Sequence, residues 1–164
     1  MLNEVIDHIL LWSYDNDRMG GFNDPHATTN IRLNQTLYLF EAYHFQKYRQ
    51  GFFDEQFELW GYGVPVIAEV YKKFSVFGGN GITLTREMIN ELEYIEGPVG
   101  EMLNELLEDI AVIETYDLSD ILASHDPIKE VERYLSREIS KESMKRFYAR
   151  EKLKSYKITK EAKQ

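Results

Sequence analysis

The chain has 164 residues and a mass of 19.4 kDa, with 43% hydrophobic and 29% charged residues. This composition predicts one globular domain that is large enough to bury a hydrophobic core. The absence of cysteine excludes disulfide bonds and thiol chemistry, and no apolar run reaches the roughly 18 residues that a transmembrane helix needs. The N-terminal residues include acidic rather than basic side chains and no small-residue cleavage site, so we expect no signal peptide. We also expect no membrane partner and a cytoplasmic location.

The net charge of −9 is distributed unevenly along the chain. Residues 136–164 contain ten Lys or Arg and four Asp or Glu, whereas residues 1–135 contain nine basic and 24 acidic residues. The pattern predicts two parts, an acidic helical domain over residues 1–135 and a basic C-terminal helix and tail over residues 136–164. The acidic part favours basic partners and repels nucleic acid, and the basic part has the opposite preference.

Helical periodicity dominates the first part of the chain. The opening residues predict an amphipathic helix, and a polar connector over residues 15–29 follows it. Thr29 or Asn30 then caps a second helix, which we expect to run to about Gln50 and to end at Gly51. The apolar face of this second helix contains Leu33, Leu37, Phe40 and His44.

Residues 52–66 do not repeat at helical spacing. Their aromatic side chains alternate, which predicts a short β-hairpin near residues 52–64 or an extended loop. Pro65 suits the first turn of a third helix, which the glycine-rich residues 77–81 end. Thr85 caps a short helix to about residue 96.

Four helical patterns make up the remainder of the chain. A long acidic amphipathic helix is expected over residues 98–116, and a short helix over residues 117–125 follows it. Asp126 and Pro127 form an N-cap and first-turn pair for the next helix. The apolar residues of that helix are Ile128, Val131, Tyr134 and Leu135.

The last predicted helix is basic and amphipathic. Ser140 caps it, and it runs to about Tyr156. Its apolar stripe is suited to dock on the acidic part of the chain, on a second copy or on a partner. Together, these patterns predict a mainly α, single-domain compact bundle of about six to eight helices, with the hairpin near residues 52–64 as the one β candidate.

No pattern in the sequence requires a catalytic, cofactor or metal site. The four histidines lack the paired spacing of a zinc site, and no Gly-x-Ser-x-Gly motif occurs. Glu41 and His44 share a helix face, as in half of a di-metal motif, but the chain has no second such pair, so an interior histidine beside aromatic residues is the better explanation. We expect a protein that is not an enzyme; the alternative is a site assembled from Glu41, His44 and His125.

Aromatic residues between positions 60 and 71 are candidates for binding a protein partner. Trp60, Tyr62 and Tyr71 have the residue types that dominate interfaces, because they bury a large area at a small cost in side-chain entropy. The alternative is that the three side chains belong to the hydrophobic core.

Two stretches carry a set of motifs in a defined order. The first contains Leu33, Leu37-Tyr38, Ala42-Tyr43-His44, Phe52-Phe53-Asp54-Glu55, Phe57-Glu58, Trp60, Gly61-Tyr62-Gly63, Pro65-Val66 and Val70-Tyr71. The second contains Leu118-Ser119, Leu122, Ser124-His125 and Pro127. In this order the motifs resemble the Panacea domain family of bacterial and phage proteins, over roughly residues 1–135.

The Panacea family comprises antitoxins of toxin–antitoxin pairs, and a related member acts as a protease adaptor. The resemblance implies a helical, non-catalytic module that neutralises a cognate toxin by direct contact. The chain departs from the family pattern where Val64 intervenes between Gly63 and Pro65, and where Ile128 replaces a Trp. His125 belongs to the second motif and joins the predicted partner-binding residues.

Three functions therefore follow from the sequence. The first is an antitoxin that binds a cognate toxin. The second is a DNA-binding regulator or a protease adaptor that uses the basic C-terminal helix, and the third is the enzyme described above. Binding to nucleic acid through the tail is not favoured, because the larger part of the chain is acidic.

Overall fold

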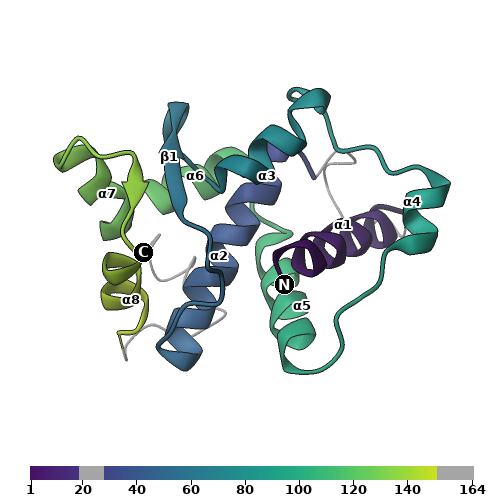
Figure 1. The fold of residues 1–164 in the computed structure, drawn as a ribbon, viewed down its shortest axis with the longest axis horizontal. Coiled ribbons are helices and arrows are strands. Elements are labelled where there is room, and N and C mark those ends of the chain that lie inside the picture. Colours follow the sequence, from purple (N-terminus) through teal and green to yellow (C-terminus); the bar gives the residue numbers. More distant parts are fainter. Residues whose placement is uncertain (19–27, 151–164) are drawn as a thin grey trace.

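The computed structural model describes residues 1–18 and 28–150, and it confirms a mainly α domain with one small sheet (Figure 1). The α-helices in these ranges are α1 (Leu2–Arg18), α2 (Asn30–Tyr48), α3 (Ala68–Lys73), α4 (Arg86–Glu91), α5 (Pro98–Ile110), α6 (Thr115–Ala123), α7 (Asp126–Arg133) and α8 (Lys141–Tyr148). The sheet contains β1 (Phe57–Trp60), β2 (Val64–Val66) and β3 (Glu138–Ile139). Most of the predicted connector and the end of the basic tail lie outside the described residues. None of the helices in the described ranges is long and apolar enough to span a lipid bilayer.

Helix α2 is the centre of the domain. Figure 1 shows α7 and α8 on one side of it and α1 and α5 on the other, and α2 also contacts α3, α6 and β2. Most of its residues are buried, because neighbours cover nearly its whole circumference. Its apolar core residues include Leu33, Leu37, Tyr38, Leu39, Phe40, Ala42 and Tyr43.

The start of α2 was predicted correctly and its end was not. Thr29 Oγ1 accepts a hydrogen bond from Arg32 N at 3.1 Å and caps the helix. At the other end, Arg49 rather than Gly51 takes the left-handed conformation, with φ of 59°. The Arg49 amide donates to Phe45 O, so the helix closes two residues before the glycine that was expected to end it.

The predicted β-hairpin is confirmed. Strands β1 and β2 pair in antiparallel register, with Leu59 opposite Pro65, and a short 3-10 turn (Gly61–Gly63) joins them. The prediction that Pro65 starts a helix is wrong. Pro65 lies in β2, an edge strand where its missing N–H is tolerated, and α3 begins at Ala68.

A non-local contact breaks the helix predicted over residues 98–116. Helix α5 ends at Ile110, and α6 begins at Thr115. The buried guanidinium of Arg32, on α2, donates to Ile110 O at 2.5 Å and to Ile113 O at 2.7 Å. A cation at these carbonyls satisfies the end of α5 and complements its dipole, and no residue within the segment itself signals this end.

The C-terminal basic helix packs on the rest of the domain. Ser140 caps α8 as predicted, but the helix ends at Tyr148 rather than near Tyr156. Strand β3 pairs with β1, and Met144 and Tyr148 are fully buried against α2 and α7. Residues 138–148 therefore share one hydrophobic core with the preceding helices.

Candidate functional site

The predicted partner-binding residues lie in two separate places. Trp60 and Tyr71 meet beside the β-hairpin, with their ring centroids 5.3 Å apart. His125 lies in the interior, beneath α8. Of Tyr62, only the backbone in the turn between β1 and β2 is described.

The Trp60–Tyr71 pair is held by the hairpin and α3. Trp60 is the last residue of β1, opposite Val64, and Tyr71 lies on α3; both side chains are half-buried. Asn30 Nδ2 donates to Tyr71 O at 2.8 Å, and Asn34 Oδ1 accepts from Ile67 N at 3.0 Å, so buried amides of α2 hold α3 at its N-cap and at Tyr71. The pair thus belongs partly to the core and partly to the surface, between the two alternatives that the sequence left open.

Two exposed residues follow α7, just before the segment that runs along β1. Tyr134 is 70% exposed and Leu135 is 94% exposed, and Leu135 has a φ of 51° in the left-handed region. Leu59 N donates to Arg137 O at 2.8 Å, which joins the segment after Leu135 to β1. We name Trp60, Tyr71, Tyr134 and Leu135 the hairpin-end surface.

Tyr134 and Leu135 were predicted to be apolar residues of the helix that begins at residue 126. Ile128 and Val131 lie on α7 and are buried, but α7 ends at Arg133, before Tyr134 and Leu135. The helical spacing of the four residues gave no sign that the helix would end before the last two.

His125 belongs to a buried chain of polar groups. Its Nδ1 lies 2.7 Å from Tyr148 Oη, and Tyr148 Oη lies 2.9 Å from Tyr38 Oη. Burial, together with the nearby charges of Arg150 and Lys129, lowers the pKa of His125 to about 4. Burial also raises the pKa of both tyrosines, so all three groups are neutral at pH 7.

The other ring nitrogen of His125 completes no hydrogen bond in the described part of the chain. Its Nε2 is buried, and no group partners it there. The ring is also packed against Phe147, with centroids 5.0 Å apart. Because the side chain is fully covered, contact between His125 and a partner requires α8 to move.

Glu41 and His44 serve separate structural purposes. The buried Glu41 carboxylate accepts from Phe52 N and Phe53 N and pairs with the Lys141 ammonium. His44 Nδ1 lies 2.6 Å from Gln50 O, and its ring packs against Phe52. The described residues contain no group of three side chains that could hold a metal ion.

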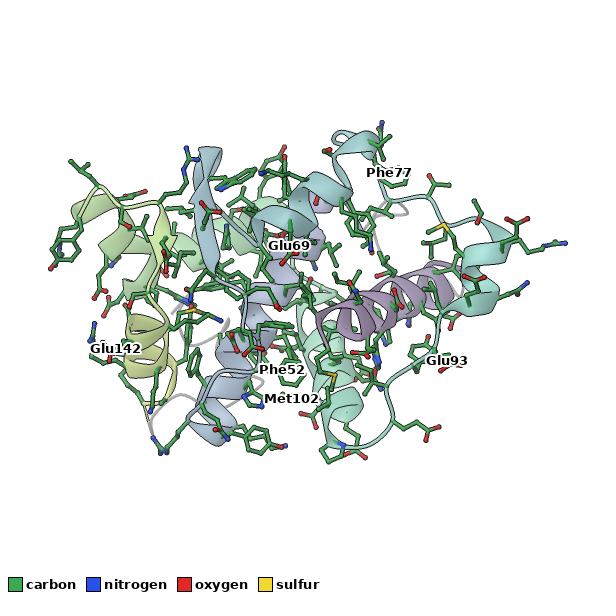
Figure 2. The ribbon with its side chains drawn as sticks, viewed as in Figure 1. Phe52, Glu69, Phe77, Glu93, Met102 and Glu142 are labelled. Atoms are coloured by element: carbon green, nitrogen blue, oxygen red, sulfur yellow. The ribbon has the colours of Figure 1, made fainter. Side chains whose placement is uncertain are left out.

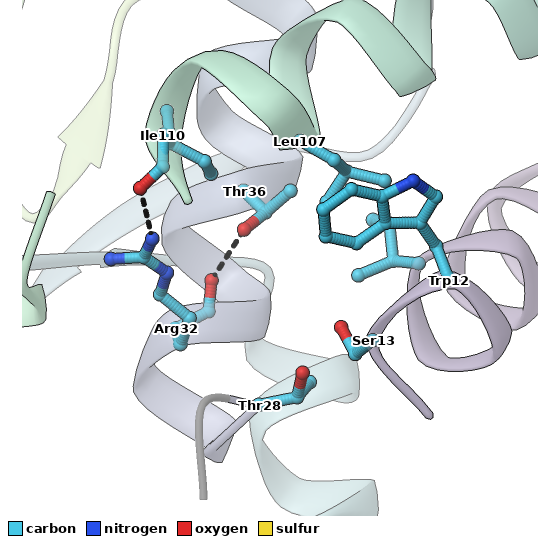
Figure 3. Close-up of a pocket in the computed structure, with 8 residues that line it drawn as sticks. Trp12, Ser13, Thr28, Arg32, Thr36, Leu107 and Ile110 are labelled. Carbon is cyan, nitrogen blue, oxygen red and sulfur yellow. Dashed lines mark hydrogen bonds between the residues drawn. The ribbon is translucent and has the colours of Figure 1, made fainter. Parts of the chain in front are cut away.

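A small cavity lies where α1, α2 and α5 meet (Figure 3). Its volume of about 10 Å³ has room for about one water molecule. Its polar lining comes from Ser13, Thr28, Arg32 and Thr36, but Arg32 donates to Ile110 O and Thr36 to Arg32 O. The cavity is too small for an organic substrate, so the hairpin-end surface is the stronger candidate for function.

No protein-family model, curated protein or solved structure matches this chain.

Proposed function

We propose that the protein is a non-catalytic antitoxin that neutralises a cognate toxin by direct contact through the hairpin-end surface. The observation that carries this proposal is the half-exposed Trp60–Tyr71 pair at the end of β1, together with the highly exposed Tyr134 and Leu135, whose following residues run along β1. Large apolar residues that are exposed beside one strand are candidates for a protein-binding surface.

The support for Trp60 and Tyr71 is their fixed geometry. The hairpin pairing and the amides of α2 order both residues before any partner arrives. Ordered aromatic anchors lose little conformational entropy on binding, so more of their buried area contributes to affinity. Leu135 adds an apolar side chain in a left-handed conformation, which is uncommon for a bulky residue and is often found at functional positions.

The toxin-binding role rests on the resemblance to Panacea domain antitoxins. The motifs of that resemblance include Trp60 and Tyr71 of the proposed surface, whereas Tyr134 and Leu135 lie outside them. The excess of acidic residues in residues 1–135 adds attraction toward a basic toxin and speeds the encounter.

Co-expression of the full chain with the product of the adjacent gene tests the proposal. Growth rescue and co-purification are scored for Trp60→Ala and for the double variant Tyr134→Ser with Leu135→Asn. Both should lose rescue, because truncating an interface anchor costs about 2 kcal/mol or more of binding free energy.

A matched control comes from another pair of exposed apolar residues. Val112 and Tyr116 are 75% and 84% exposed at the junction of α5 and α6. The double variant Val112→Asn with Tyr116→Ser should keep rescue. If Tyr134→Ser with Leu135→Asn also rescues fully and co-purifies at the wild-type ratio, the hairpin-end surface does not bind the toxin.

A further inference from the structure

A second surface, distant from the hairpin turn, is defined by positive charge. An open groove lies between the C-terminal ends of α2 and α8. It is lined by Arg49, Glu142, Lys145, Arg146, Ala149 and Arg150. Four of these six residues are cations, in a chain whose net charge is −9, so the groove is a basic site on an acidic protein.

Three of the four cations have no carboxylate partner in the described part of the chain. Arg146 lies 3.3 Å from Glu130, whereas no described carboxylate lies within 4.0 Å of Arg49, Lys145 or Arg150. Glu142, which Figure 2 labels on α8, also lines the groove, but among the described residues no ion pair joins it to a groove cation. The groove therefore contains four cations and one carboxylate, which leaves an excess of positive charge.

The negative ends of two helix dipoles balance part of this positive charge. Arg49 Nη1 donates to Ala149 O at 2.8 Å, and Arg150 Nε donates to Phe147 O at 3.0 Å, so both side chains complement the end of α8. The C-terminal ends of α2 and α8 together carry about one negative charge. This is less than the total positive charge of Arg49, Lys145 and Arg150. Lys145 makes no such contact, and its ammonium remains directed to solvent as an exposed side chain.

The backbone and the ring contacts fix the guanidinium groups. The Arg49 guanidinium is held by its hydrogen bond to Ala149 O, and Arg49 itself closes α2 in a left-handed conformation. The Arg150 guanidinium lies 4.1 Å from the centroid of the Phe147 ring, which limits its motion. Planar guanidinium groups held in this way are suited to two-point recognition of carboxylates.

We infer that the groove formed by Arg49, Lys145, Arg146 and Arg150 binds a short acidic peptide segment of a partner protein. This site differs from the hairpin-end surface and stands whether or not that surface binds a toxin. A carboxylate-rich segment matches the charge of the groove, and a short segment contacts the groove alone.

A nucleic acid fits the same observations less well. A long polyanion would run from the groove onto the remainder of a chain with a net charge of −9, where repulsion opposes binding. A short acidic peptide avoids that repulsion, because charges farther away than about 8 Å are largely screened at physiological salt.

Fluorescence anisotropy with a labelled octaglutamate peptide tests the inference on the full chain. Wild-type protein should bind the peptide saturably in low salt and more weakly in high salt. The double variant Lys145→Gln with Arg150→Gln should weaken binding by about tenfold or more, because it removes two charge-assisted contacts. A control double variant, Lys72→Gln with Arg86→Gln, removes the same charge from exposed sites outside the groove and should bind within about twofold of wild type.

Any of three other results would overturn the inference. Equal weakening by the two double variants indicates general attraction of charge rather than a site. Tighter binding of a single-stranded RNA of the same charge, lost in the groove variant, assigns the groove to nucleic acid. The absence of saturable binding by the peptide shows that the cations serve the helix ends alone.

Discussion

The ammonium of Lys141, in the first turn of α8, pairs with the buried carboxylate of Glu41 in the middle of α2. The two residues are 100 positions apart in the chain. Glu41 is fully buried, and its carboxylate also accepts hydrogen bonds from Phe52 N and Phe53 N. Lys141 Nζ donates in addition to Phe53 O at 3.1 Å. This one ion pair therefore joins the basic C-terminal helix, the central helix and the approach to the hairpin.

Lys141→Met should destabilise the domain by about 2–4 kcal/mol, because it leaves the Glu41 carboxylate buried without a counter-charge. Urea denaturation measures the change. The double variant Lys141→Met with Glu41→Gln is the matched control, since it removes both charges and keeps an acceptor for the two amides. It should recover part of the loss; a double variant as unstable as the sum of the two single variants would contradict the coupling.

Arg32→Met should destabilise the domain by about 2–3 kcal/mol, because Ile110 O and Ile113 O lose charged donors at the end of α5. Hydrogen exchange should increase over residues 111–114 before it increases in α2. Arg32→Lys keeps the positive charge and should cost less. If Arg32→Lys and Arg32→Met are equally unstable, the packing of the Arg32 stem matters more than its charge.

Local signals in the sequence predicted the starts of helices better than their ends. Thr29, Thr85 and Ser140 each cap a helix, because the side-chain hydroxyl accepts a hydrogen bond from the backbone amide three residues later. That spacing is visible in the sequence. The end of α5 depends on Arg32, which is 78 positions from Ile110. No local pattern contains that information, and the helix predicted over residues 98–116 therefore ran past Ile110, where α5 ends.

The candidate site could likewise be predicted only in part from local patterns in the sequence. Trp60 and Tyr71 were predicted to bind a partner from their residue types alone; the structure brings their rings together, and the binding itself stays a prediction. Tyr134 and Leu135 were assigned to the same helix as Ile128 and Val131 because their spacing continues that pattern. Their exposure follows from the left-handed turn at Leu135 and the pairing of β3 with β1, a contact between distant segments. Helical periodicity alone cannot report where a chain leaves a helix to join a sheet.

Gly100→Ala should destabilise the domain by about 1–3 kcal/mol through a steric clash. A Cβ at Gly100 would lie 1.8 Å from Ile95 O, so the loop before α5 must move. That movement would also disturb the hydrogen bond from Ile95 N to His8 Nδ1. Gly79→Ala is the control, because nothing lies within 4 Å of the added atom and it should keep the wild-type melting temperature. Equal melting temperatures for the two variants would show that the loop yields without cost.

Stability should fall as the pH decreases from about 6.5 to about 4, because of His125. Its pKa is lowered from 6.5 to about 4 in the folded protein, so between these values the unfolded chain binds a proton that the folded chain does not. The contribution to stability is fully present above pH 6.5 and is lost as the pH falls to about 4. At about 1.4 kcal/mol per pH unit, it amounts to about 3 kcal/mol.

Urea denaturation of wild type and His125→Gln across that pH range tests the assignment. His125→Gln removes the titrating group, so its stability should depend less steeply on pH, although it starts lower because the link to Tyr148 is weakened. Some slope should remain, since burial also lowers the pKa of His8. The ring protons of His125, followed by NMR in the folded protein, should shift near pH 4 rather than near pH 6.5. Parallel stability curves for the two proteins would show that His125 is not the group responsible.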